Sequence, residues 1–161
     1  MGTMLELCES LPVRSVTTDE VVVVEDEPTG QMFVVVSGHF AVTRQGEPVA
    51  MITEPGAVIG EVSALLDSPA GATVTATSDG ELHVIDDPAA FLATNTDGVH
   101  EIARLLAARL NRLVGYLADL KAQYGATQGH LGLVDEVLSK LTFSPELSVE
   151  PGSERDPDPQ Y

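Results

Sequence analysis

Short segments in the first half of the chain alternate apolar and polar residues, a pattern that predicts β-strands. They are rich in Val, Thr and Ile, and turn signals such as Ser37-Gly38, Gln45-Gly46 and Asp79-Gly80 separate them. Several short strands at close spacing are typical of an all-β sandwich or jelly roll. We predict a mainly β domain over residues 16–86, with strands at 21–25, 31–37, 39–44, 48–52, 72–77 and 81–86.

The apolar period lengthens after residue 86, which predicts helices. Asp87 followed by Pro88 is a helix-start pattern, because a carboxylate caps free N–H groups and proline fits the first turn. Residues 97–124 then form one long helix. Its apolar residues repeat at alternating steps of four and three, the spacing of a coiled-coil seam. They are Val99, Ala103, Leu106, Leu110, Leu113, Leu117, Leu120 and Tyr124.

Two uses of this helix stay open. Its apolar stripe could pack on the β domain, and Ile102 and Leu105 widen that stripe early in the helix. The later, narrower seam favours a parallel contact between two copies of the chain. Both can hold together. We expect a homodimer through Leu106, Leu110, Leu113, Leu117 and Leu120.

The remaining segments are short. One or two helical turns are expected within residues 3–10, before Pro12. Residues 125–143 form an appendage with an amphipathic helical piece at 133–141. Residues 144–161 are predicted to be disordered, because they are acidic, rich in proline and poor in large apolar side chains. We therefore expect one ordered domain over residues 1–124.

The charge balance excludes two classes of partner. The chain carries 25 Asp and Glu against 8 Lys and Arg, a net charge of −17. Residues 1–143 alone keep 20 acids against 7 bases, a net charge of −13. Such a field repels nucleic acid and anionic membranes, since duplex affinity rests largely on Lys and Arg. No apolar run approaches the roughly 20 residues of a membrane span. We expect neither a nucleic-acid nor a membrane partner.

Compartment and catalysis can also be addressed from composition. The single cysteine, Cys8, leaves no internal disulfide framework and fits a reducing compartment, so we expect a cytoplasmic protein. A β-roll enzyme of the cupin type would need a His-x-His pair for its metal, and the four histidines are scattered. No catalytic Ser/His/Asp spacing, Gly-rich phosphate loop or cysteine cluster appears. We expect no enzyme activity, no catalytic residue and no metal.

Residues 58–76, VIGEVSALLDSPAGATVTA, carry the most specific chemistry. Gly60 permits a close backbone approach, and Glu61 can accept a hydrogen bond from a ribose hydroxyl. The turn at 61–66 offers backbone N–H groups to an anion, although Glu61 could instead serve only the N–H groups of its own turn. With the hairpin stretch MFVVVSGHFAV (32–42), this segment resembles the cyclic nucleotide-binding domain. That family includes the bacterial catabolite activator protein and the regulatory subunits of cyclic-AMP-dependent kinase.

The resemblance covers about residues 10–124 and implies a β-roll followed by a long helix. It also implies a phosphate-binding cassette in which the residue at the position of Glu61 binds the ribose. In the catabolite activator protein, hydroxyls of the long helix contact the adenine, and by the resemblance Leu113 and Val114 stand at those positions here. The cassette residues in this chain are Gly60, Glu61, Val62, Ser63, Ala70, Gly71, Ala72 and Thr73.

The cassette departs from the family at its phosphate ligand, an arginine that directly follows the cassette proline. Here Pro69 is followed by Ala70, and no Lys or Arg lies between Arg44 and Arg104. An arginine could reach the phosphate only from outside the cassette, from the long helix at Arg104, Arg109 or Arg112. We therefore expect a degenerate site with weak or absent cyclic AMP binding.

Two functions of different class stay open. The first is a non-enzymatic regulatory or sensor module, with no cofactor beyond a weakly bound cyclic nucleotide; the retained Gly60 and Glu61 favour it. The second is a structural or protein-interaction module that uses the β-roll as scaffold, the long helix for dimerisation and an unidentified protein as partner. The missing arginine favours this second function. A DNA-binding transcription factor is not expected, because no recognition helix follows the long helix.

Overall fold

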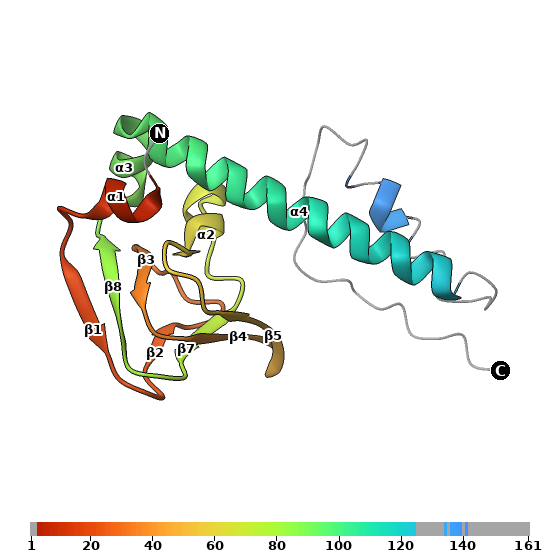
Figure 1. The fold of residues 1–161 in the computed structure, drawn as a ribbon, viewed down its shortest axis with the longest axis horizontal. Helices are drawn as coiled ribbons and strands as arrows, with labels where there is room; N and C mark the ends of the chain where they lie inside the picture. The colour runs from red at the N-terminus through yellow and green to blue at the C-terminus, as the bar shows by residue number, and fades with distance from the viewer. Residues whose placement is uncertain (1–2, 125–133, 135, 140, 142–161) are drawn as a thin grey trace. The chain divides into compact units, whose positions relative to one another are not determined.

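The computed structural model describes residues 3–124, 134, 136–139 and 141 (Figure 1). The chain divides into two units, Met1–Ala107 and Ala108–Tyr161, which are treated separately below. The described residues between 134 and 141 are helical, within the stretch predicted to be an amphipathic piece. The acidic tail predicted to be disordered, residues 144–161, lies outside the described residues.

The first unit is built on two four-stranded antiparallel sheets (Figure 1). One sheet has the order β1 (Val13–Val16), β8 (Gly80–Ile85), β3 (Met32–Ser37) and β6 (Val58–Ile59). The other has the order β2 (Val21–Val23), β7 (Thr73–Ala76), β4 (Phe40–Arg44) and β5 (Glu47–Ile52). Strands far apart in sequence are neighbours in both sheets. The predicted mainly β fold followed by a long helix is confirmed.

Two of these strands were not predicted, and both depend on distant partners. β1 exposes most of its residues and buries only Val16, so its alternation is weak in the sequence. It is held by antiparallel pairing with β8, for example Val16 with Gly80. β6 has only two residues, both buried, and pairs with Phe33 and Val34 of β3. Neither signal is long enough to be recognised locally.

The start of α3 (Pro88–Thr94) follows the predicted capping chemistry, and α1 (Met4–Cys8) has a capping box that was not predicted. In α1, Thr3 and Glu6 form a reciprocal capping box, with Thr3 N–H donating to Glu6 at 2.7 Å. α3 begins with Pro88, and the Asp87 carboxylate accepts from the N–H of Ala90 at 2.9 Å. α4 (Thr96–Tyr124) is a single helix of 29 residues. The stretch predicted as an apolar turn at 61–66 is a short helix, α2 (Glu61–Leu66).

The first unit has two apolar clusters. One fills the space between the sheets and contains Phe33, Phe40, Leu82 and several valines. The other lies at the end of the sheets where α1, α3 and the start of α4 gather (Figure 1). Cys8 belongs to this second cluster and is fully buried, and its burial raises the pKa of the thiol to about 11. The thiol is therefore neutral at ordinary pH and acts as a small apolar side chain.

The early part of α4 packs against the second cluster. Ile102 is only 1% exposed, and Leu105 and Leu106 are partly buried against it. This confirms the packing interpretation for the first turns of the helix. Leu106 was also predicted to belong to a dimer seam, and the structure places it on the core of its own chain. Further along the helix, Leu110 and Leu113 are 43% and 47% exposed, and Leu117 and Leu120 are half-buried.

Candidate functional site

The cassette begins at a glycine that the local backbone requires. Gly60 precedes α2 with a left-handed φ of 90°. A Cβ at this position would lie 3.0 Å from the carbonyl oxygen of Gln31 and 3.7 Å from Cα of Met32. Both strain and crowding therefore exclude larger side chains. This close approach lets the chain leave β6 and enter α2 directly beside β3.

Ser63 ties the two halves of the cassette together. Its carbonyl oxygen accepts from the N–H groups of Asp67 and Ser68, and Asp67 adopts a left-handed conformation with φ 49°. The Ser63 hydroxyl donates to the carbonyl oxygen of Pro69 at 3.4 Å. These bonds end α2 and return the chain toward Ala70. The cassette is thus a closed local unit, held by hydrogen bonds that do not depend on a ligand.

Ala70 occupies the position where the resemblance places the phosphate-binding arginine. Its N–H donates to the carbonyl oxygen of Glu27 at 3.0 Å, and its own carbonyl oxygen accepts from the N–H of Asp26 at 2.8 Å. The residue is 3% exposed and belongs to the apolar cluster between the sheets. The backbone at this position is therefore fixed, and its side chain is part of the core.

The other predicted residues divide between the interior and the surface. Glu61 is 4% exposed at the first turn of α2, a burial that ordinary surface carboxylates do not show. Val62 and Gly71 are exposed, whereas Ala72 and Thr73 are half-buried. The Thr73 hydroxyl accepts from the N–H of Glu25 at 3.0 Å and so joins the strand to the loop after β2. The structure thus brings the predicted cassette together as one continuous turn, helix and strand.

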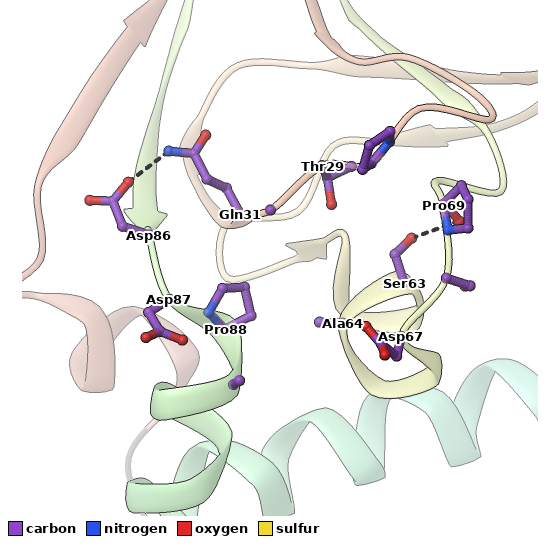
Figure 2. Close-up of a pocket in the computed structure, with 13 residues that line it drawn as sticks. Thr29, Gln31, Ser63, Ala64, Asp67, Pro69, Asp86, Asp87 and Pro88 are labelled. Carbon is purple, nitrogen blue, oxygen red and sulfur yellow. Dashed lines mark hydrogen bonds between the residues drawn. The ribbon is translucent and has the colours of Figure 1, made fainter.

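A cavity of about 410 Å³ lies beside α2, and it is acidic (Figure 2). Its lining comes from the loop 28–31, from α2 and the turn after it, and from residues 86–89. Asp67, Asp86 and Asp87 line it, and the Gln31 amide donates to Asp86 at 2.6 Å (Figure 2). No Lys or Arg is among the lining residues. A phosphate is therefore not favoured there, and we do not assign this cavity to an anion.

The first unit contains three arginines, and their surroundings differ. Arg14 donates to Glu20 at 2.6 Å and lies over the ring of Phe33. Arg104 of α4 donates to Glu101 at 3.1 Å. Arg44 stands at the end of β4, exposed. The sequence offers the arginines of the long helix as outside partners for a phosphate and gives no local signal for Arg44. Only the strand register could have revealed its place.

Comparison with known proteins agrees with the two-sheet fold and its long helix. A family model described as the cyclic nucleotide-binding domain matches residues 13–93, half of the chain. No curated protein matches by sequence. The catabolite activator protein of Thermus thermophilus superposes with a TM-score of 0.58 at 25% identity, covering 74% of this chain and 57% of that chain.

Two further structures are similar. The N-terminal domain of a transcriptional regulator from Streptomyces coelicolor A3(2) has a TM-score of 0.51 at 25% identity, covering 67% of this chain and 81% of that chain. A protein kinase A regulatory-subunit domain bound to Sp-2Cl-cAMPS has a TM-score of 0.53 at 21% identity, covering 67% of this chain and 75% of that chain. Other matched chains are longer, and this chain spans 29% and 43% of two of them.

The family match spans the strands, the cassette and α3, which are the parts that form the site described above. The two-sheet architecture is shared with the catabolite activator and kinase regulatory structures. This chain belongs to the cyclic nucleotide-binding domain family.

Proposed function

We propose that the chain is a non-enzymatic regulatory module whose cyclic-nucleotide site keeps its backbone but has lost its principal phosphate ligand. One observation carries this proposal: Ala70 stands at the arginine position of the cassette and is only 3% exposed. Its backbone is nevertheless held by hydrogen bonds to Asp26 and Glu27. The buried Glu61 supports retention of a ribose contact. Cyclic AMP or cyclic GMP is the proposed ligand, and its binding is weak.

The missing contact sets the expected affinity. A hydrogen bond to a charged group contributes roughly 1.5–3 kcal/mol net, and guanidinium–phosphate pairs are commonly bidentate. Its loss weakens binding by about one to two decades, at ~1.4 kcal/mol per decade. The acidic stretch 25–27 adds repulsion close to Ala70. A ligand that typically binds at about one micromolar would then bind at roughly ten to a hundred micromolar from this loss alone, and the repulsion moves the dissociation constant further toward the millimolar range.

Isothermal titration of the wild-type protein with cyclic AMP and cyclic GMP tests this proposal. We expect heats that fit only a dissociation constant in the high micromolar to millimolar range. Adenosine serves as a matched ligand without phosphate. Sub-micromolar binding of either cyclic nucleotide would contradict the degenerate site.

We also propose that the chain forms a homodimer and is cytoplasmic. Leu110 and Leu113 are large apolar residues left exposed on α4, which supports a homodimer through the later part of this helix. The single, buried and unpaired cysteine supports a reducing, cytoplasmic environment. Among the described residues, no helix has the length and apolar content to cross a membrane.

A second candidate function is a protein-interaction module in which the β-roll is only a scaffold. Two features favour it: the apolar environment of Ala70 and the exposed leucines of α4. In this case neither cyclic nucleotide would bind, and an unidentified protein partner would contact α4.

No group of three or more His, Cys, Asp or Glu side chains suited to a metal occurs among the described residues.

Duplex DNA should not bind specifically. Residues 1–143 carry 20 acids against 7 bases, and a net charge of −13 opposes the counterion release on which DNA affinity depends. In a fluorescence anisotropy assay at physiological salt, we expect no saturable binding to random or palindromic duplexes at micromolar protein. Sub-micromolar, sequence-dependent binding would contradict the regulatory role proposed here, because it would indicate a transcription factor.

A further inference from the structure

The inner face of β4 can be followed residue by residue from its pairing with β7. Phe40 pairs with Ala76, and Val42 pairs with Val74. All four belong to or pack against the apolar cluster between the sheets. Directly opposed residues of an antiparallel pair point to the same face, and successive residues alternate. Phe40 and Val42 of β4 therefore face the inside of the β-roll; the register irregularity after Val42 lies in the pairing of β4 with β5, not with β7.

Arg44 is the next residue in this inward-facing series. The last pair between β4 and β7 is Thr43 with Thr73, and extending this register by one step places Arg44 opposite Ala72. Ala72 is a cassette residue with only a methyl side chain, and it leaves room for a long side chain to pass. The hairpin turn at Gln45 and Gly46, both with positive φ, ends the strand directly after Arg44. Arg44 thus stands at the mouth of the β-roll, beside the end of the cassette.

The guanidinium of Arg44 differs from those of Arg14 and Arg104 in its ion pairing. Arg14 and Arg104 are paired with Glu20 and Glu101, but within the described part of the chain Arg44 forms no ion pair. Two carboxylates are its neighbours. Glu25 accepts from the N–H of Gln45 at 2.8 Å, and Glu47 is the hairpin partner of Arg44.

The backbone of the cassette is open at Gly71, directly before Ala72. A Cβ built on Gly71 would meet no atom within 4 Å, and Gly71 is exposed. Gly71 lies between the buried Ala70 and the residue opposite Arg44. A phosphate beside the backbone of Gly71 would therefore be close to Arg44 without displacing a side chain.

We infer that Arg44 supplies the arginine contact to the ligand phosphate, from β4 across the sheet rather than from the cassette. The ligand class is a nucleoside phosphodiester, so this inference rests on the proposed function. The guanidinium presents a planar fork of donors that fits two phosphate oxygens. Arg44 accounts for the residual affinity of a site that has alanine at position 70.

The test is a set of NMR titrations with cyclic AMP and with adenosine, up to about 10 mM ligand because millimolar binding is expected. The proteins are the wild type, Arg44→Ala, Arg44→Lys and Arg104→Ala. We expect Arg44→Ala to weaken cyclic AMP binding about tenfold, the loss of one charge-assisted contact. Arg44→Lys should fall in between, because an ammonium keeps the charge but not the fork. Adenosine binding should stay the same in all four proteins.

The outcomes separate this inference from the proposed function. Equal cyclic AMP binding by wild type and Arg44→Ala overturns the role of Arg44 and leaves the proposed function intact. Weakening by Arg104→Ala instead of Arg44→Ala also overturns it and assigns the contact to α4. If the wild type does not bind but an Ala70→Arg variant does, the cassette is confirmed and Arg44 contributes nothing. If neither binds, the nucleotide ligand itself is wrong, and the inference falls with it.

Discussion

Replacing Ala70 with arginine should raise the affinity for cyclic AMP at least about tenfold, from the ~1.5–3 kcal/mol expected of one charge-assisted contact. The backbone at this position is already fixed by its hydrogen bonds to Asp26 and Glu27. The new side chain would start in the apolar interior and extend its guanidinium toward the open space at Gly71. There it would also offset part of the surrounding negative charge. Isothermal titration of wild type and variant side by side measures the gain.

Matched controls make this result specific. Ala70→Met adds bulk without charge, so it should give no gain in affinity. Thermal unfolding should show that both variants fold, since overpacking a core position costs about 1–3 kcal/mol. In the Ala70→Arg background, Glu61→Ala should remove much of the gain, because the ribose contact would then matter. A folded Ala70→Arg protein with no gain would mean that the cassette no longer forms a ligand site, and the interaction-module function would then be favoured.

The second large effect concerns assembly. Leu113→Glu combined with Leu117→Glu should convert a dimer into a folded monomer. Burying a leucine contributes roughly 1.5–3 kcal/mol, and two facing pairs of carboxylates would add repulsion to that loss. Leu113 is 47% exposed and Leu117 is half-buried in the single chain, and neither belongs to an apolar cluster of the first unit. Light scattering coupled to size-exclusion chromatography gives the mass directly.

A matched variant tests whether the seam itself matters. Asn111→Glu with Ala118→Glu adds the same charge at exposed positions of α4 outside the seam, and it should stay dimeric. Circular dichroism should show equal helix content in both double variants. A wild type that is already monomeric at high micromolar concentration would exclude the dimer. So would a monomeric Asn111→Glu and Ala118→Glu variant, because net charge rather than the seam would then explain the effect.

Local patterns in the sequence were sufficient for much of the fold. Alternation identified the strands that contain Phe40 and Val74, since a half-buried strand shows its two faces in its own residues. Asp87 and Pro88 identified the start of α3, because capping involves residues only a few positions apart. The cassette could be recognised because Gly60 and its neighbours form a continuous segment whose backbone geometry is local. The absence of arginine at position 70 was equally visible.

Other features depended on contacts between distant residues. β1 and β6 exist because β8 and β3 supply their hydrogen bonds, and their own residues carry too little pattern to show it. The apolar repeat of α4 could not separate Leu106, which packs on the core, from Leu113, which stays exposed, because both fit one helical stripe. Thr43 and Thr73 are 30 positions apart, and only the pairing of β4 with β7 brings the end of β4, and with it Arg44, next to the cassette. Local periodicity therefore determined the class of fold, and the resemblance of the cassette showed that its arginine is missing, whereas the register between strands was needed to relate Arg44 of β4 to the cassette.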